Sequence, residues 1–372
     1  MTDPVPAGVG AEADALNLLL ALISDRPCAR IGQGMDAAGW NRFADLAIHV
    51  HRVAGLVDRA LAKADPGVPD RVRGRIAEAA RRHAFSALAC KAETRRIAEA
   101  LAPLPTPAVM VKGWPLGERL TGSAALRHAK DVDLMLAPAA LPEALARLRE
   151  IGHVPAPPHR VRVAAIARPE ILQGVHNLTL LAPPGNLEIE IHWRSYPFRH
   201  WPDLADFAGA TEPHPIDATG VSIAVPADGA HLVYLALHGE WHLWLRLKWV
   251  WDVHAMAARR GSHGLRHDLA LARRIGAERA LVLALHLSAR LLGTALPADW
   301  PALDAGGRRA ERTVLHLIAG GVAPGTPRAR FETYRFALRR AATAAQRWAV
   351  LDYLGPRRAR LALSAWRRDG AA

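Results

Sequence analysis

The feature that most constrains the fold is a pair of carboxylates inside an apolar run, Asp131-Val132-Asp133-Leu134. Alternate side chains of a β-strand face the same way, so Asp131 and Asp133 would project from one face while Val132 and Leu134 pack on the other. Two negative charges on one face repel each other. A bound Mg²⁺ (or Mn²⁺) compensates this repulsion, because Mg²⁺ is held by one or two carboxylates together with substrate phosphates. The run therefore predicts a buried strand that carries a metal site.

A second acidic run, Leu187 to Trp193, has the same alternation and would place Glu188, Glu190 and His192 on one face. If this strand lies beside the first, a third carboxylate completes a two-metal site, for which the pattern favours Glu190 over Glu188. Two metal ions would stabilise both the attacking and the leaving oxygens of an in-line displacement at phosphorus. His192 is either a substrate contact or a structural histidine.

The other half of such a site lies upstream, where an apolar strand over residues 108–111 meets Lys112 and Gly113. A glycine after a strand allows backbone N–H groups to approach a phosphate closely. Arg127 and Lys130 would neutralise triphosphate charge, since arginine suits bidentate phosphate contacts. The chain holds few lysines, so the place of Lys112 beside the glycine favours a function over a surface role.

A further polar cluster follows in the C-terminal third. His238 and His242 are four residues apart and share one face of a helix, but no third zinc ligand is evident. We expect them to line a cleft beside the strands. Of the next charged residues, Arg246 and Lys248 could reach a phosphate or an acidic acceptor. The alternative is a helix surface on which Arg246, Lys248 and Asp252 form salt bridges.

The 372 residues suffice for two or three domains. Hydrophobic periodicity and three closely spaced prolines after residue 102 divide the chain into an N-terminal helical region (1–103), an α/β core (104–226) and a C-terminal helical domain (227–372). The core would contain two strands and a β-hairpin around residues 182–186. The longer helices are expected over Leu46 to Leu61, Arg71 to Ala102, Leu141 to Ile151, His231 to Arg259, Leu265 to Leu296, Arg309 to Gly320 and Thr333 to Tyr353.

Composition limits the remaining classes of protein. No apolar run is long enough to span a bilayer, and no secretory signal or paired cysteine spacing is evident, so we expect a cytoplasmic protein. The net charge of +13 is almost all arginine and is spread along the chain. A nucleic-acid partner is therefore possible but not favoured. The basic segment Arg357 to Arg368 is expected to be a solvated terminal helix, or else to touch RNA or an anionic membrane surface.

Taken together, these residues resemble the uncharacterised nucleotidyltransferase family of the DNA polymerase β-like superfamily. The resemblance runs from about Trp40 to Ala258. It implies an α+β fold in which a small mixed-sheet core is flanked by N-terminal and C-terminal helical domains. It also implies Mg²⁺ and a nucleoside triphosphate (NTP), with Asp131, Asp133 and Glu190 as metal-binding and catalytic carboxylates and Gly113 in the phosphate-contacting turn.

The chain departs from the superfamily pattern at the turn. Gly113 is followed by Trp114 instead of serine, so Lys112 or Ser123 would have to replace that hydroxyl. The interval to Asp131 is longer than usual, and Lys130 stands where a small polar residue is more common. These differences bear on triphosphate binding more than on metal binding.

The expected activity is the transfer of a nucleoside monophosphate from ATP or another NTP to an acceptor hydroxyl, with release of pyrophosphate. Lys112, Gly113, Arg127, Lys130, His192 and Lys248 are expected to bind the nucleotide. The acceptor is unidentified and could be a small molecule, a peptide or an RNA. Two alternatives stay open: a kinase-like phosphotransferase that uses the same site, and a non-catalytic accessory protein that binds a nucleotide, a peptide or RNA.

Overall fold

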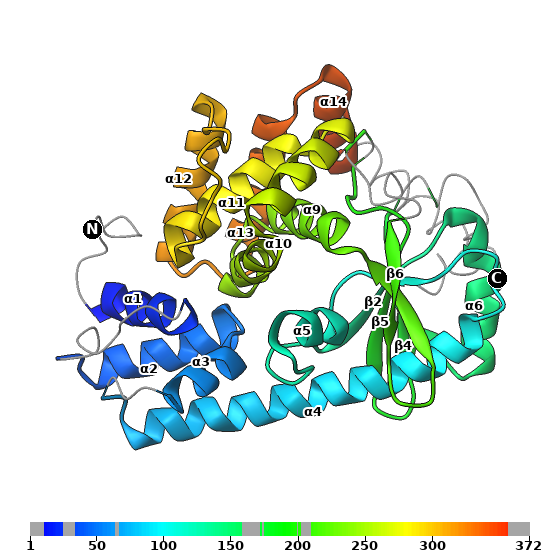
Figure 1. Cartoon of the computed structure of the whole chain (residues 1–372), viewed down its shortest axis with the longest axis horizontal. Coiled ribbons are helices and arrows are strands. Elements are labelled where there is room, and N and C mark those ends of the chain that lie inside the picture. The colour runs from blue at the N-terminus through cyan, green and yellow to red at the C-terminus, as the bar shows by residue number, and fades with distance from the viewer. Residues whose placement is uncertain are drawn as a thin grey trace.

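A computed structural model describes residues 11–24, 34–63, 67–157, 172, 175–198, 200–201 and 210–355 of the chain. It has a seven-stranded mixed sheet with helices before and after it in sequence (Figure 1). This is the α+β architecture that the sequence predicts, with a small sheet core and helical flanks. The basic segment 357–368 lies outside the described residues.

The N-terminal helices are α1 (Ala11–Ile23), α2 (Ala37–Asp45), a π-helical turn η1 (Leu46–Val50), α3 (Ala54–Leu61) and α4 (Asp70–Leu101). The long helix α4 runs from these helices to the sheet (Figure 1). The prediction of one helix over Leu46 to Leu61 is wrong, because the helix is interrupted at His51 and Arg52. Arg52 adopts a left-handed backbone conformation, with φ of 55°.

The sheet has the strand order β3-β4-β5-β2-β1-β7-β6. Strands β1 (Val109–Met110) and β2 (Asp131–Met135) and the hairpin of β4 (Asn177–Ala182) and β5 (Leu187–His192) confirm the sequence prediction. Three short strands were not predicted: β3 (Val154–Pro155), β6 (Thr211–Pro215) and β7 (Ser222–Pro226). Their prolines and polar residues break the alternation that identifies a strand.

The two faces of the central strands differ in chemistry. Val132 and Leu134 of β2, with Ile189 and Ile191 of β5, lie in one apolar core with residues of α4 and of α6 (Leu141–Glu150). Because side chains alternate along a strand, the carboxylates of both strands project from the opposite face. That face is turned toward the C-terminal helices, since Met135 packs in their core. The sheet thus presents its acidic face to the rest of the molecule.

The C-terminal helices are α9 (Asp228–Trp241), α10 (Leu247–Arg274), α11 (Glu278–Leu292), α12 (Ala305–Ala319), α13 (Pro327–Arg340) and α14 (Ala344–Leu354). Three of the longer helices expected from the sequence are interrupted. His231 to Arg259 is divided by a turn at residues 242–246, Leu265 to Leu296 by a turn at 275–277, and Thr333 to Tyr353 by a bend at 341–343. Apolar periodicity continues through these turns and hides them.

Close packing explains the turn between α9 and α10. Leu243 and Trp244 have φ values of 55° and 53°, and the ring of buried Trp244 lies directly against Gly239. A Cβ at Gly239 would lie only 2.1 Å from that ring, so this position requires glycine. The chain can therefore fold back on itself and begin α10 at Leu247.

The helix interruption at His51 and Arg52 contacts the start of α10. The Leu247 N–H donates to His51 Nδ1 at 3.3 Å, and the Lys248 N–H donates to the His51 carbonyl at 3.4 Å. The first N–H groups of a helix have no partner within the helix, so His51 serves as a cap supplied from another part of the chain. Burial lowers the pKa of His51 to about 3, which keeps its ring neutral. This cap holds Arg52 beside α10.

The N-terminal and C-terminal helices share one hydrophobic core, which contains Leu18, Leu19, Phe43, Trp244 and Leu283. The sheet forms a second core with α4 and α6. Of the helices described, none combines the length and apolar character needed to cross a bilayer.

Candidate active site

Strands β2 and β5 pair in parallel, and their register decides which acidic residues meet. Asp131 lies opposite Glu188, and Asp133 lies opposite Glu190. The sequence leaves open whether the two acidic strands are neighbours. In the structure these strands are neighbours, and the predicted carboxylates lie on one face of the sheet.

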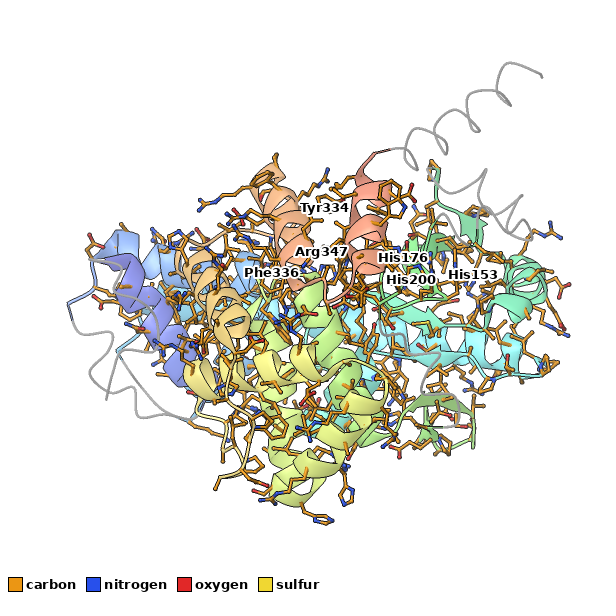
Figure 2. The ribbon with its side chains drawn as sticks, turned by 90° about the horizontal axis from the view of Figure 1, so that it is seen from above. His153, His176, His200, Tyr334, Phe336 and Arg347 are labelled. Atoms are coloured by element: carbon orange, nitrogen blue, oxygen red, sulfur yellow. The ribbon has the colours of Figure 1, made fainter. Side chains whose placement is uncertain are left out.

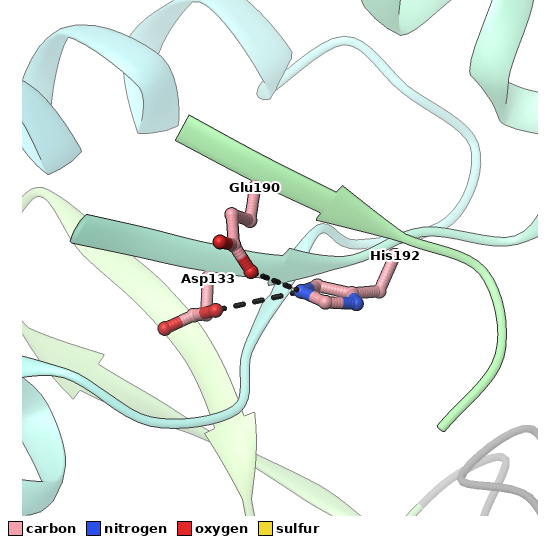
Figure 3. Close-up of side chains that lie close together, drawn as sticks. All are labelled: Asp133, Glu190 and His192. Carbon is pink, nitrogen blue, oxygen red and sulfur yellow. Dashed lines mark ion pairs between the residues drawn. The ribbon is translucent and has the colours of Figure 1, made fainter. Parts of the chain in front are cut away.

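Asp133, Glu190 and His192 form the centre of this face (Figure 3). His192 Nε2 lies 3.4 Å from Asp133 Oδ1 and 3.3 Å from Glu190 Oε2. One possible ligand atom from each residue falls within 4.8 Å of the others. Although burial opposes it, contact with both carboxylates raises the pKa of His192. Burial also acts against the charge of Glu190, yet His192 and Lys112 lower the pKa of that carboxyl to about 2.

Lys112 supplies the nearest cation to this centre. Its Nζ lies 2.5 Å from Asp133 Oδ1, and the carboxylate is almost completely buried, with 1% of its side chain exposed. Burial opposes the charge of Lys112, but Asp133 and the other carboxylates raise its pKa. The pKa of Asp133 is lowered in turn, because Lys112 and His192 outweigh its own burial. The pair is therefore ionised at neutral pH.

The donor set fits a divalent cation. The Lys112 contact lacks hydrogen-bond geometry, so both buried oxygens of Asp133 have no hydrogen-bond donor among the described residues. Buried polar atoms without a partner are costly, and a bound ion is one way to satisfy them. Asp133 and Glu190 offer the oxygen ligands that Mg²⁺ prefers, and His192 offers a nitrogen, which suits transition metals better.

Asp131 and Lys130 lie toward the outside of the site. The Asp131 side chain is 22% exposed, and Lys130 Nζ lies 3.7 Å from its Oδ2. Lys130 also forms an ion pair with Glu188 at 2.5 Å. Since Glu188 is held at the rim by Lys130, the geometry favours Glu190 as the third carboxylate.

The predicted phosphate turn at Gly113 is built from several parts. Gly113 has φ of 88°, and a Cβ there would lie 2.7 Å from Met110 Cε, so glycine is required. Arg127 Nη1 donates to the Gly113 carbonyl at 3.2 Å. The same guanidinium forms two hydrogen bonds of 2.7 and 2.8 Å with Asp252 of α10. These contacts hold the turn, whereas a direct phosphate contact by Arg127 stays a prediction.

Neither Trp114 nor Ser123 offers a hydroxyl group to this turn. Trp114 begins α5 (Trp114–Thr121), is completely buried, and donates from Nε1 to Thr94 at 2.9 Å. The Ser123 hydroxyl accepts from the Ala125 N–H at 3.2 Å and does not line the pocket. Lys112 is thus the remaining candidate for the missing group.

A cavity of about 210 Å³ lies between the sheet and α9 and α10. Of the residues described above, it is lined by Lys112, Gly113, Arg127, Lys130, Asp131, Asp133 and Glu190. Its lining holds six lysines and arginines against three carboxylates, so the cavity carries a positive excess that suits a polyphosphate. His238 and His242 line it as predicted. The alternative of a salt-bridged surface at residues 246–252 is wrong, because Asp252 is completely buried against Arg127.

Two arginines face this cavity without an ion-pair partner among the described residues. Burial and the nearby charge of Arg52 lower the pKa of Arg246 to about 10, and its Nε has no hydrogen-bond partner. Burial also lowers the pKa of Arg52. Arg52 was not predicted as a site residue. Its sequence neighbours follow an apolar helix pattern, and no local signal indicates that its backbone is left-handed. Lys248 likewise faces the cavity, and burial lowers its pKa.

The fold and this site together define a nucleotidyltransferase type of architecture: carboxylates on adjacent strands, a glycine turn and a cation-lined cavity. The model of a family described as uncharacterised nucleotidyltransferases matches residues 36–293, which is more than half of the chain. The chain therefore belongs to the uncharacterised nucleotidyltransferase family, as the resemblance in its sequence indicates. A search of curated proteins and a search of solved structures each found no match.

Proposed function

We propose that this protein transfers a nucleoside monophosphate from an NTP to an acceptor hydroxyl and releases pyrophosphate. The observation that carries the proposal is the parallel pairing of β2 and β5. It sets Asp133 opposite Glu190 at the floor of a cavity with twice as many cationic as acidic side chains. Carboxylates surrounded by a positive excess suit a substrate that is a metal complex of a polyphosphate.

The residues divide into two groups by position. Asp131, Asp133 and Glu190 would hold Mg²⁺ or Mn²⁺, with His192 beside them. When bound, the metal supplies charge stabilisation to the reacting phosphate and its leaving group. Glu190, with its pKa of about 2, stays ionised at neutral pH. It would orient the acceptor hydroxyl. A carboxyl of such low pKa is a weak base, so loss of the hydroxyl proton would depend on the metal that Glu190 helps to hold.

The second group binds the triphosphate. Lys112 and the Gly113 turn lie nearest to the carboxylates, while Arg52, Arg246 and Lys248 lie on the helical side of the cavity. Desolvated cations that repel one another are stabilised by an incoming anion, and this repulsion favours binding. Arg127 would act by holding the turn, and Lys130 would contact phosphate only from the rim.

The acceptor is a small molecule, a peptide or an RNA, and no residue of the cavity selects among these. One observation favours a second function, that of a non-catalytic module that binds the nucleotide. The Gly113 turn lacks the hydroxyl group usual at this point, and Trp114 is buried away from the cavity. Retained nucleotide binding without pyrophosphate release would identify such a module.

The first test is calorimetric binding of α,β-methylene analogues of ATP, GTP, CTP and UTP, with and without Mg²⁺. We expect wild-type protein to bind at least one analogue only with Mg²⁺, and Asp131→Asn/Asp133→Asn to lose at least tenfold in affinity. Removing two of three carboxylates should abolish metal binding, because metal affinity depends on ligand charge. The product of a reaction with the natural NTP would then show whether a nucleotide or a phosphate is transferred.

A matched control is Asp299→Asn, which removes a carboxylate that is 63% exposed and pairs with Arg266 far from the cavity. This variant should bind like the wild type. Failure of folded wild-type protein to bind any analogue would contradict the proposal. Equal binding by the wild type and the double variant would show that the carboxylates hold no metal.

A further inference from the structure

A second cavity lies beside the metal-binding one, in the helical part of the molecule. It is an open cavity with a volume of about 350 Å³, bounded by the turn after α9 and by the start of α13. Its walls include the rings of Trp241 and Tyr334, whose centroids are 6.4 Å apart, with planes at 66°. Figure 2 shows Tyr334 on α13, next to α14. Arg330 and Thr333 of the same helix add polar groups to the wall.

The two cavities adjoin. His242 and Arg246 line both of them, so the 242–246 turn forms their common boundary. His242 also lies close enough to Glu190 and Asp133 for these carboxylates to affect its pKa. A molecule with its phosphates beside the carboxylates would have to pass His242 and Arg246 to reach the second cavity.

The first cavity offers little to a nucleobase. About 210 Å³ holds a polyphosphate and its metal, and the walls there are mostly charged. Its tryptophan, Trp249, is already stacked on His242 at 4.8 Å and has the Arg246 guanidinium 5.5 Å from its ring. The aromatic side chains of the second cavity are the alternative, since bases of any kind stack on aromatic side chains. Trp241 has an edge contact with Phe198 at 5.2 Å and Tyr334 a tilted contact with Tyr353 at 6.2 Å, whereas Trp249 is stacked face to face on His242.

We propose that the second cavity binds the nucleoside end of the donor, with the base against Tyr334 and Trp241. The inference rests on the proposed function, because it assumes that the triphosphate lies in the first cavity. Arg246 would then contact the donor where its phosphates and nucleoside meet. Stacking on aromatic rings tolerates different bases, so the cavity would recognise a nucleoside without strict base selection.

The experiment compares a nucleotide with a triphosphate that lacks the nucleoside. Calorimetry on the full chain with Mg²⁺ would measure binding of the α,β-methylene NTP analogues and of inorganic tripolyphosphate. We expect the best analogue to bind the wild type at least tenfold more tightly than tripolyphosphate. Tyr334→Leu should remove about tenfold of this advantage, as the loss of one stacking contact predicts, and leave tripolyphosphate binding unchanged.

A second variant protects the test against poor folding. Thr333→Trp fills the cavity but keeps Tyr334, and it should weaken nucleotide binding without weakening tripolyphosphate binding. The matched control is Phe331→Leu on the same helix, an aromatic residue that is 66% exposed and does not line the cavity. This control should bind both ligands like the wild type. Circular dichroism and thermal unfolding would confirm that all variants are folded.

Three outcomes would overturn the inference in distinguishable ways. Full nucleotide affinity in both cavity variants would place the base elsewhere. Equal binding of nucleotide and tripolyphosphate by the wild type would mean that the nucleoside is not recognised, while the phosphate site stands. Binding of neither ligand by folded wild-type protein would remove the proposed function together with this subsite.

Discussion

Lys112 and Asp133 hold opposite charges 2.5 Å apart inside the cavity, and only 15% of the lysine side chain is exposed. The ammonium group stands beside the carboxylate that the proposal assigns to the metal. It would partly neutralise Asp133 before the metal binds and contact a phosphate afterwards. This double role is consistent with the absence of a turn hydroxyl near Gly113.

We expect Lys112→Met to destabilise the protein by about 3–5 kcal/mol without divalent metal, because it removes the ammonium group from the buried carboxylate of Asp133 and leaves it only the more distant contact with His192. Mg²⁺ or Mn²⁺ should restore part of this loss by binding that carboxylate. Urea unfolding with and without each metal measures both effects. The control, Lys63→Met, removes an exposed lysine and should change neither value. An equal loss with and without metal would contradict the metal assignment of Asp133.

At the scale of elements, the helix breaks matter most to the site. The break at His51 and Arg52 brings an arginine into the cavity and caps α10. The turn at residues 242–246 places His242 and Arg246 between the two cavities. Continuous helices would have removed both arginines from the site, so the interruptions are part of how the fold builds it.

We predict that Gly239→Ala destabilises the protein by about 3 kcal/mol or more, because the new methyl group would lie 2.1 Å from the Trp244 ring. Thermal or urea unfolding would measure this loss. The control is another helical glycine, Gly74, where an added Cβ meets nothing within 4 Å. Gly74→Ala should stabilise the protein by about 0.5–1 kcal/mol. Similar effects of the two substitutions would show that Trp244 does not pack as described.

On the scale of the whole molecule, Arg52 of the N-terminal region and residues of α9 and α10 line the cavity on the acidic face of the sheet. This arrangement buries many histidines near the site. Burial, reinforced for some by nearby cations, lowers the pKa of His51, His231 and His242 to about 3 each. The pKa values of His83, His128 and His238 are lowered as well, again chiefly by burial.

Stability should therefore fall as the pH drops below 6.5. The unfolded chain binds protons at these histidines near pH 6.5, while the folded protein keeps His51, His231 and His242 neutral down to about pH 3. Within that window, each buried histidine lowers the free energy of unfolding by up to about 1.4 kcal/mol for every pH unit of acidification. Urea unfolding at pH 7.5, 6.5 and 5.5 measures the effect. A free energy of unfolding that stays constant between pH 7.5 and 5.5 would contradict the burial of these rings.

The chemistry of the central strands can be predicted from local sequence alone. Strand alternation is local, so it placed Asp131 with Asp133 and Glu190 with His192 on common faces, and it predicted the hairpin and the glycine turn. It also carried enough ordered landmarks to indicate the family. These features depend on neighbours a few residues apart, which a pattern can read directly.

How distant segments meet depends on long-range packing, which no local pattern shows. The parallel register places Asp133 opposite Glu190, and Asp252 accepts hydrogen bonds from the guanidinium of Arg127. His51 caps a helix that begins almost 200 residues later in the chain. The apolar pattern continues through the helix breaks and does not show them. The 242–246 turn depends on the packing of Trp244 on Gly239, and the 275–277 turn contains Gly276, whose φ is 76°. Arg52 lines the first cavity, and the second cavity is formed, only because these long-range contacts hold the segments in place.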